Sequence, residues 1–120
     1  MWSPTYRYFA KVDRVVDGDT VDVAIEVGMN ITVHARCRLF GIDASETRGE
    51  ERPKGLLAKE RLRELIKDVA TDDGKILVQT IKDKTGKFGR YLVILLDPVN
   101  GVQNLNETLV SEGHAERRDY

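Results

Sequence analysis

The sequence contains little cysteine, little net charge and no long apolar run. Its single cysteine, Cys37, excludes an internal disulfide, and without a second cysteine a cysteine-based zinc motif cannot form. The residues around it predict a buried thiol on a strand. No segment approaches the roughly 20 consecutive apolar residues of a membrane-spanning helix. We therefore expect a soluble protein without a membrane partner.

A secretory signal is also absent from the visible amino terminus. Met-Trp-Ser-Pro-Thr-Tyr-Arg has neither a charged n-region nor an apolar h-region. We expect an intracellular or virus-encoded setting, and the compartment itself stays open.

Charge of either sign is not in excess. The chain has 19 basic and 20 acidic residues, a net charge of −1. Proteins that coat nucleic acid non-specifically depend on net positive charge, so this balance argues against that class. It suits a site whose acidic groups are neutralised by a bound cation and whose few arginines converge locally.

The length of 120 residues and the hydrophobic fraction of 41% predict one domain over residues 1–120. We expect residues 1–7 and 116–120 to be flexible ends, and the protein to be a monomer.

Alternating apolar and polar residues predict three strands in the first half of the chain, at residues 8–15, 21–27 and 33–39. Gly28-Met29-Asn30 predicts a tight reversal between the second and third. The sequence Asp17-Gly18-Asp19 falls at the turn between the first and second. These segments predict a three-stranded meander.

The second half predicts a charged loop at residues 48–54 and then a helix. Its apolar stripe repeats at helical spacing and consists of Ala58, Leu62, Leu65, Ile66 and Val69. Residues 75–81 and 91–96 predict two further strands, the latter buried on both faces. Asn104 and Glu107 resemble a capping box for a short helix, with Gly113 as the residue that ends it.

This element order predicts a mainly β, α+β fold: a five-stranded Greek-key barrel of the oligonucleotide-binding type. One helix lies between strands three and four, and a short helix lies near the carboxyl terminus. A generic α+β domain fits the same order.

Two acidic clusters and two arginines carry the chemistry: Asp17-Gly18-Asp19, Arg38, Asp43-Ala44-Ser45-Glu46 and Gly89-Arg90. Carboxylates can hold a hard cation, a further glutamate can move a proton, and guanidiniums can grip a phosphate. Each cluster alone has a plainer interpretation, as a turn, a solvated loop or a strand start. Together they describe machinery for cutting a phosphodiester bond.

Four stretches in register resemble the staphylococcal nuclease family: residues 15–20, 38–47, 87–91 and 105–115. The resemblance covers residues 9–115. It implies a five-stranded oligonucleotide-binding barrel and calcium-dependent endonucleolytic cleavage of DNA and RNA at the P–O5′ bond, which leaves 3′-phosphate ends. We expect nucleic acid as the partner, with single strands preferred.

The resemblance also implies roles for particular residues. Asp19 and Asp43 match side-chain ligands of one Ca²⁺, and Ala44 matches a ligand that acts through its backbone carbonyl. The remaining matches are Asp17 as an acidic neighbour of the metal site, Glu46 as general base, Arg38 and Arg90 as phosphate-binding arginines, and Lys87 with Phe88 as substrate contacts.

Three features depart from the family pattern. Phe88 lacks the phenolic hydroxyl of the usual tyrosine, so one hydrogen bond to a nucleotide phosphate is expected to be missing. Ser45 stands where a proline is usual, which predicts a less rigid loop. The sequence ends soon after Ala115, before the family's carboxyl-terminal helix and its aromatic nucleotide contacts.

Two alternatives stay open at this point. One is a barrel that binds nucleic acid or protein with weak or no catalysis, and the other is an interaction domain with a vestigial site. Neither His34 nor His114 sits in a motif, so we do not expect a catalytic histidine.

Overall fold

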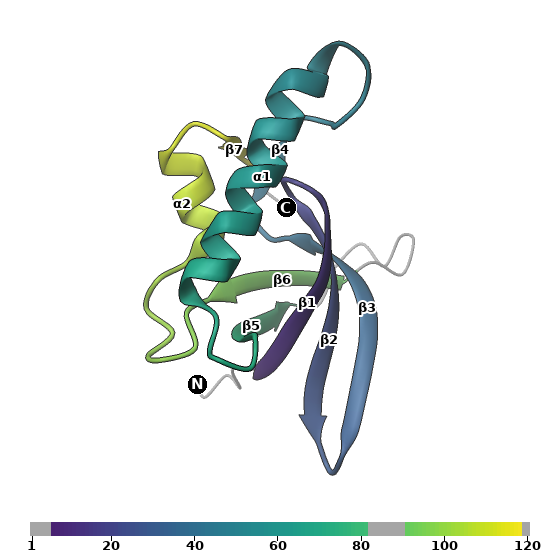
Figure 1. The fold of residues 1–120 in the computed structure, drawn as a ribbon, viewed down its shortest axis with the longest axis vertical. Coiled ribbons are helices and arrows are strands. Elements are labelled where there is room, and N and C mark those ends of the chain that lie inside the picture. The colour runs from purple at the N-terminus through teal and green to yellow at the C-terminus, as the bar shows by residue number, and fades with distance from the viewer. Residues whose placement is uncertain (1–5, 82–90, 119–120) are drawn as a thin grey trace.

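The computed structural model describes residues 6–81 and 91–118, and Figure 1 shows how their elements are arranged. In chain order the elements are β1 (Arg7–Asp17), β2 (Thr20–Gly28), β3 (Ile31–Leu39), β4 (Ile42–Ala44), a 3-10 turn (Gly49–Glu51), α1 (Arg52–Val69), β5 (Lys75–Ile81), β6 (Tyr91–Leu96), α2 (Leu105–Ser111) and β7 (Ala115–Arg117).

Five strands close into a barrel in the order β1-β2-β3-β6-β5. Neighbouring strands are antiparallel except β3 and β6, which run parallel. The predicted five-stranded barrel is confirmed, with α1 between its third and fourth strands in the chain and α2 after its fifth. Flexibility of residues 1–7 and 116–120 stays a prediction, although Glu116 and Arg117 lie in β7.

The β2–β3 hairpin turns where the sequence predicts it. Met29 and Asn30, the two residues between the paired ends Gly28 and Ile31, have φ angles of 53° and 61°. Positive φ at both central residues is the conformation of a type I′ turn, whose twist matches that of the flanking strands.

The predicted loop over residues 48–54 is wrong in its second half. Gly49–Glu51 form the 3-10 turn, and α1 already begins at Arg52. The start of α1 could not be recognised in the sequence, because its first residues are charged and include Pro53. Proline is tolerated in the first turn of a helix, because its missing N–H would have no partner in the helix there.

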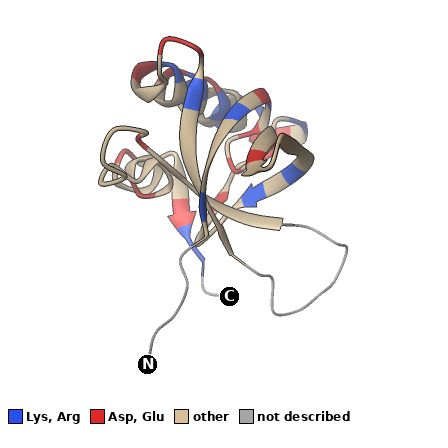
Figure 2. Cartoon of the chain, turned by 90° about the horizontal axis from the view of Figure 1, so that it is seen from below, with Lys and Arg blue, Asp and Glu red and all other residues tan. Residues whose placement is uncertain are grey.

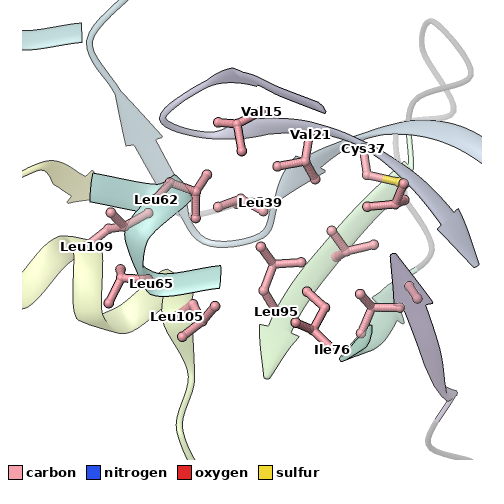
Figure 3. Close-up of a cluster of buried hydrophobic side chains, with 14 of the residues drawn as sticks. Val15, Val21, Cys37, Leu39, Leu62, Leu65, Ile76, Leu95, Leu105 and Leu109 are labelled. Carbon is pink, nitrogen blue, oxygen red and sulfur yellow. The ribbon is translucent and has the colours of Figure 1, made fainter. Parts of the chain in front are cut away.

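The core lies between the barrel interior and the inner faces of both helices. Leu62 and Leu65 of α1 and Leu105 and Leu109 of α2 pack with strand residues such as Leu39, as Figure 3 shows. The predicted α1 stripe is confirmed: Ala58, Leu62 and Leu65 are buried, and Ile66 and Val69 pack against the core. Cys37 is a buried thiol, as expected.

The ends of α2 agree with the sequence in part. Asn104 caps its start by accepting a hydrogen bond from the Glu107 N–H at 3.1 Å. Glu107 itself contacts Arg117 instead of completing the capping box. Gly113 (φ 81°) ends the helix with the paired bonds of a Schellman motif, from Gly113 to Val110 and from His114 to Leu109.

A two-stranded sheet of β4 and β7 adjoins the barrel and was not predicted. It pairs Asp43 with Glu116 and Ala44 with Ala115, so it holds the segment that follows β3. No helix in residues 6–81 or 91–118 is both long and apolar enough to cross a membrane.

Candidate functional site

Asp19 lies in the turn between β1 and β2, and its carboxylate points into the protein. Only 6% of the residue is exposed. Its Oδ2 accepts a hydrogen bond from the Ala44 N–H at 3.0 Å, and its Oδ1 accepts one from the Thr20 hydroxyl at 3.0 Å. Its own backbone carbonyl accepts a bond from the Leu39 N–H at 2.8 Å. The turn is thereby tied to the end of β3 and to β4.

Arg38 links the two predicted side-chain metal ligands. Its Nη2 lies 3.4 Å from Asp19 Oδ2 and 3.3 Å from Asp43 Oδ1. The three side chains come from different elements: the β1–β2 turn, β3 and β4. The closing of the barrel therefore directs two carboxylates from separate parts of the sequence at one cationic atom.

Burial raises the pKa of the Asp19 carboxyl above its usual value. The hydrogen bond from Ala44 and the charge of Arg38 lower this pKa, but they offset the cost of desolvation only in part. A buried carboxylate with so little access to water gains more from a nearby cation than an exposed one does.

Gly18 allows these elements to approach one another. A Cβ at this position would lie 2.7 Å from the Cβ of Ala58 in α1 and 3.0 Å from the Cβ of Ala44 in β4. Both distances are shorter than side-chain contacts normally allow, so a larger residue would push the Asp19 turn away from β4.

Gly55 likewise allows close packing, in this case between α1 and the loop that carries Glu46. A Cβ on Gly55 would overlap the backbone carbonyl of Glu46 and lie 2.9 Å from the carbonyl oxygen of Ser45. The first turn of α1 therefore packs directly on the loop backbone. The sequence patterns did not single out Gly55, although an isolated glycine within a helix commonly signals such a packing constraint.

Asp17 and Glu46 lie on a neighbouring part of this surface. Asp17 accepts a hydrogen bond from the Thr47 hydroxyl at 2.8 Å, which anchors the loop next to Glu46. Glu46 is exposed, and its carboxylate lies 3.6 Å from Arg48 Nε. Both acids line one cleft of about 420 Å³, together with the basic residues Arg14, Arg36, Arg48 and Lys59.

Asp43 borders a different cleft, of about 510 Å³, on the other side of the loop. The other charged side chains that line this cleft are mostly acidic, namely Glu50, Glu51 and Glu116 beside Lys54. Figure 2 shows basic and acidic positions interspersed along the helices and strands. The separation of charge is therefore local: the Asp43 side of the loop is acidic and the Glu46 side is basic.

The donors gathered here are hard oxygen atoms, the type that Ca²⁺ and Mg²⁺ prefer. Within residues 6–81 and 91–118, no three His, Cys, Asp or Glu side chains are grouped closely enough to form a metal site alone. The predicted set needs only two such side chains, Asp19 and Asp43, because Ala44 would contribute its backbone carbonyl. Their shared contact with Arg38 shows that both carboxylates face one cationic atom. Two carboxylates directed at one point are the kind of donor set that such an ion would need.

The predicted residues Lys87, Phe88 and Arg90 lie outside the part of the chain that the structure describes. Among those described, Asp19, Arg38, Asp43 and Ala44 come together, while Asp17 and Glu46 share the adjacent cleft. His34 lies 3.7 Å from Asp13 and 72% of its side chain is exposed, and His114 lines the acidic cleft.

Residues 36–120 match the family model described as staphylococcal nuclease homologue. The chain belongs to the staphylococcal nuclease family. The matched residues include Arg38, Asp43 and Glu46 but begin after Asp17 and Asp19. The contacts of Asp19 with Arg38 and Ala44 therefore connect the first two strands to the matched segment. No curated protein matches the sequence.

Proposed function

We propose that this member of the staphylococcal nuclease family is a calcium-dependent endonuclease that hydrolyses DNA and RNA at the P–O5′ bond. The observation that carries the proposal is the convergence of Asp19 and Asp43 on Arg38 beside the loop that bears Glu46. Oxygen ligands, a phosphate-binding fork and a carboxylate base carried on neighbouring elements are the groups that phosphodiester cleavage requires.

Arg38 stabilises the charge that develops on the phosphate. Its guanidinium is held in place by two carboxylates and only 19% of the side chain is exposed, so it is oriented before substrate binds. A planar fork can form paired charge-assisted hydrogen bonds to two phosphate oxygens. Pre-oriented donors of this kind cost no rearrangement as the transition state forms.

Glu46 acts as the general base that takes a proton from the attacking water. Its carboxylate is exposed to the cleft, and its backbone is fixed by Gly55 and by the neighbouring bond from Thr47 to Asp17. A base whose backbone packs against a helix can stay within reach of the water during attack.

Asp19, Asp43 and the Ala44 carbonyl would hold Ca²⁺, with Asp17 nearby. When bound, the ion supplies Lewis-acid polarisation of the phosphate and lowers the pKa of coordinated water. Arg38 would then exchange part of its contact with the carboxylates for contact with phosphate. We assign Arg90 to the second phosphate contact and Lys87 with Phe88 to the nucleotide, and we expect Arg90→Lys to lower kcat by orders of magnitude.

A barrel that binds nucleic acid with weak catalysis is the second candidate. The basic lining around Glu46 favours it, because four cations beside the two carboxylates of that cleft would suit a bound phosphate strand as well as a cleavage reaction. The charges alone do not distinguish the two functions.

Digestion of heat-denatured DNA and of RNA, with calcium or with a chelator, distinguishes them. We expect fragments with 3′-phosphate ends in calcium and intact strands in the chelator. Glu46→Gln, which keeps the size and hydrogen-bonding capacity of the side chain, should abolish most cleavage while retaining oligonucleotide binding. Binding by the wild type without cleavage at any calcium concentration would select the second candidate.

A further inference from the structure

The basic cleft beside Glu46 continues along α1. A second cleft of about 490 Å³ lies between α1 and β1, and Arg14 lines both. Lys59 belongs to the first cleft, and Arg63 and Lys67 belong to the second. The three α1 residues are spaced four apart, so they project from one side of the helix. The two clefts meet at Arg14, and we call them together the α1–β1 groove.

Three of these cations are available to a ligand. Among the described residues, Arg14, Lys59 and Lys67 form no ion pair within 4 Å, whereas Arg63 contacts Glu60 at 3.3 Å. This contrasts with Arg61, on another side of α1, which contacts both Glu64 and Glu112. Arg14 attracts Asp22 on the neighbouring strand without forming an ion pair, and together with the hydrogen bond from Arg36 its charge contributes to lowering the pKa of that carboxyl. The groove therefore retains positive charge mainly on Lys59 and Lys67, with a smaller share on Arg14.

The acidic residues of the α1–β1 groove do not cancel its charge. The lining contains six basic side chains and four acidic ones, and two of the four acids, Asp17 and Glu46, lie at the end that carries the site. Away from that end the acids are Asp13, which contacts His34, and Asp72. Arg36, Arg48 and Arg63 are ion-paired with Asp22, Glu46 and Glu60. The positive charge that remains along the path therefore comes from Arg14, Lys59 and Lys67.

We propose that the α1–β1 groove binds the sugar–phosphate backbone of the nucleic-acid strand that extends from the cleavage site. This inference rests on the proposed function and names a path for its substrate. From Lys59 to Lys67 the helix rises about 12 Å. That distance covers a few successive nucleotides of a stacked strand, whose rise along the helix axis is roughly 3.4 Å each.

The chemistry of the lining predicts phosphate contacts without base recognition. Neither cleft is lined by a described aromatic residue that could stack on a base. Binding should therefore depend on strand length and on salt more than on sequence. Long strands should gain from the groove, whereas short ones that fill only the cleavage site should not.

The test measures binding separately from cleavage. Fluorescence anisotropy with labelled dT16 and dT4, in chelator and with gel analysis to confirm intact strands, compares the wild type with a triple variant (Arg14→Gln, Lys59→Gln, Lys67→Gln). Lys11→Gln is the matched control, because it removes one positive charge from β1 outside the groove. Lys67→Gln alone and circular dichroism melting check that any loss is not due to unfolding.

We expect the triple variant to lose at least about tenfold in dT16 affinity. Its log–log salt slope should fall by about 2, because removing three cations that each neutralise one phosphate lowers the slope by roughly 0.7 per phosphate. Affinity for dT4 should change little, and Lys11→Gln should behave as the wild type. Unchanged dT16 affinity and salt slope in the triple variant would overturn the proposal. Equal losses of affinity for dT4 and dT16 would overturn it as well.

The result is independent of catalysis. A wild type that binds dT16 through the groove but never cleaves would refute the nuclease proposal and leave the groove intact. Calcium-dependent cleavage by a triple variant that binds dT16 normally would support the nuclease proposal and refute the groove proposal.

Discussion

Arg38 Nη2 lies 3.4 Å from Oδ2 of the buried Asp19, so the β3 strand and the β1–β2 turn share one ion pair at the edge of the barrel. The same nitrogen also contacts Asp43, which makes the guanidinium the link between two acids that the sequence separates. This arrangement gives one side chain two tasks, because it neutralises a buried carboxylate and presents a phosphate-binding fork.

Arg38→Lys tests the second task. Lysine keeps the positive charge but cannot form two parallel bonds to a phosphate. We expect kcat to fall by about 10²–10³, the usual cost of removing a pre-oriented donor to the transition state. Arg7→Lys is the control, since Arg7 lies at the start of β1 outside both clefts and is bonded to Gln79. Turnover near the wild-type rate in Arg38→Lys would exclude this role.

Asp43→Asn tests the metal assignment. The substitution keeps the side chain's shape and removes one negative charge from the expected ion site. We expect calcium affinity, measured by isothermal titration calorimetry, to weaken at least about tenfold, because the affinity of such sites depends on ligand charge. Asp22→Asn, an aspartate on β2 that contacts Arg36, should leave calcium binding unchanged. Equal affinities in wild type and Asp43→Asn would reject the assignment.

Gly55→Ala should destabilise the protein, the opposite of the usual effect in a helix. Alanine at an ordinary helical position is favoured over glycine by roughly 0.5–1 kcal/mol. Here the methyl group would overlap the Glu46 carbonyl, and such overpacking costs about 1–3 kcal/mol. Urea denaturation should show the loss, and kcat should fall with it because Glu46 is displaced. Leu57→Ala, at an exposed position of the same helix, should change stability by less than about 0.5 kcal/mol.

Asn106→Asp tests a buried polar link. Asn106 Nδ2 donates to the carbonyls of Phe40 and Val93 at 3.0 and 3.1 Å, and its Oδ1 accepts from the Leu95 N–H at 3.2 Å. An aspartate would place an acceptor against two carbonyl oxygens. We expect a loss of at least about 2 kcal/mol in the free energy of unfolding.

The control for that substitution is Asn104→Asp at the start of α2. Aspartate caps a helix as well as asparagine does, so stability should stay within about 0.5 kcal/mol of the wild type. Chemical denaturation at pH 7 compares the two variants. A similar small effect in both would mean that the Asn106 amide contributes little.

We expect the buried thiol of Cys37 to make the protein less stable at alkaline pH. Burial raises the pKa of its thiol from 9.0 to about 11 in the folded protein. The unfolded chain therefore ionises first, and stability is lost as the pH rises from 9 to 11, by at most about 1.4 kcal/mol per pH unit. Denaturation curves of the wild type and Cys37→Ala should converge in this window, because the other groups titrate in both. Parallel curves would show that the thiol does not contribute.

Sequence patterns were sufficient for most of the elements because each pattern reflects a local property. Alternation of apolar and polar residues along β2 shows which side of the strand is buried. The four-residue spacing of Ala58, Leu62 and Ile66 does the same for α1. The start of α1 was misplaced because Arg52 and Pro53 carry no apolar periodicity. The β4–β7 pair was missed since three-residue strands contain too little alternation to detect.

Asp19, Asp43 and Arg38 could be named from the sequence because their types and order carry the chemistry. The sequence could not show that both carboxylates contact the same Arg38 nitrogen. That contact depends on how the barrel closes and on which side chains remain buried. The same is true of the close packing at Gly18 and Gly55, where the absent side chain matters only in relation to a distant backbone.

The sequence by itself determined most of the strands, the helix stripe and the identity of the chemical groups, because these follow from local periodicity and residue type. The family resemblance, and not periodicity, favoured a barrel over a generic α+β domain. Only the tertiary structure decided that the Glu46 loop separates an acidic cleft from a basic one and that α1 extends the basic side. Charge separation in space results from long-range packing, and it is invisible in a chain whose charges almost cancel.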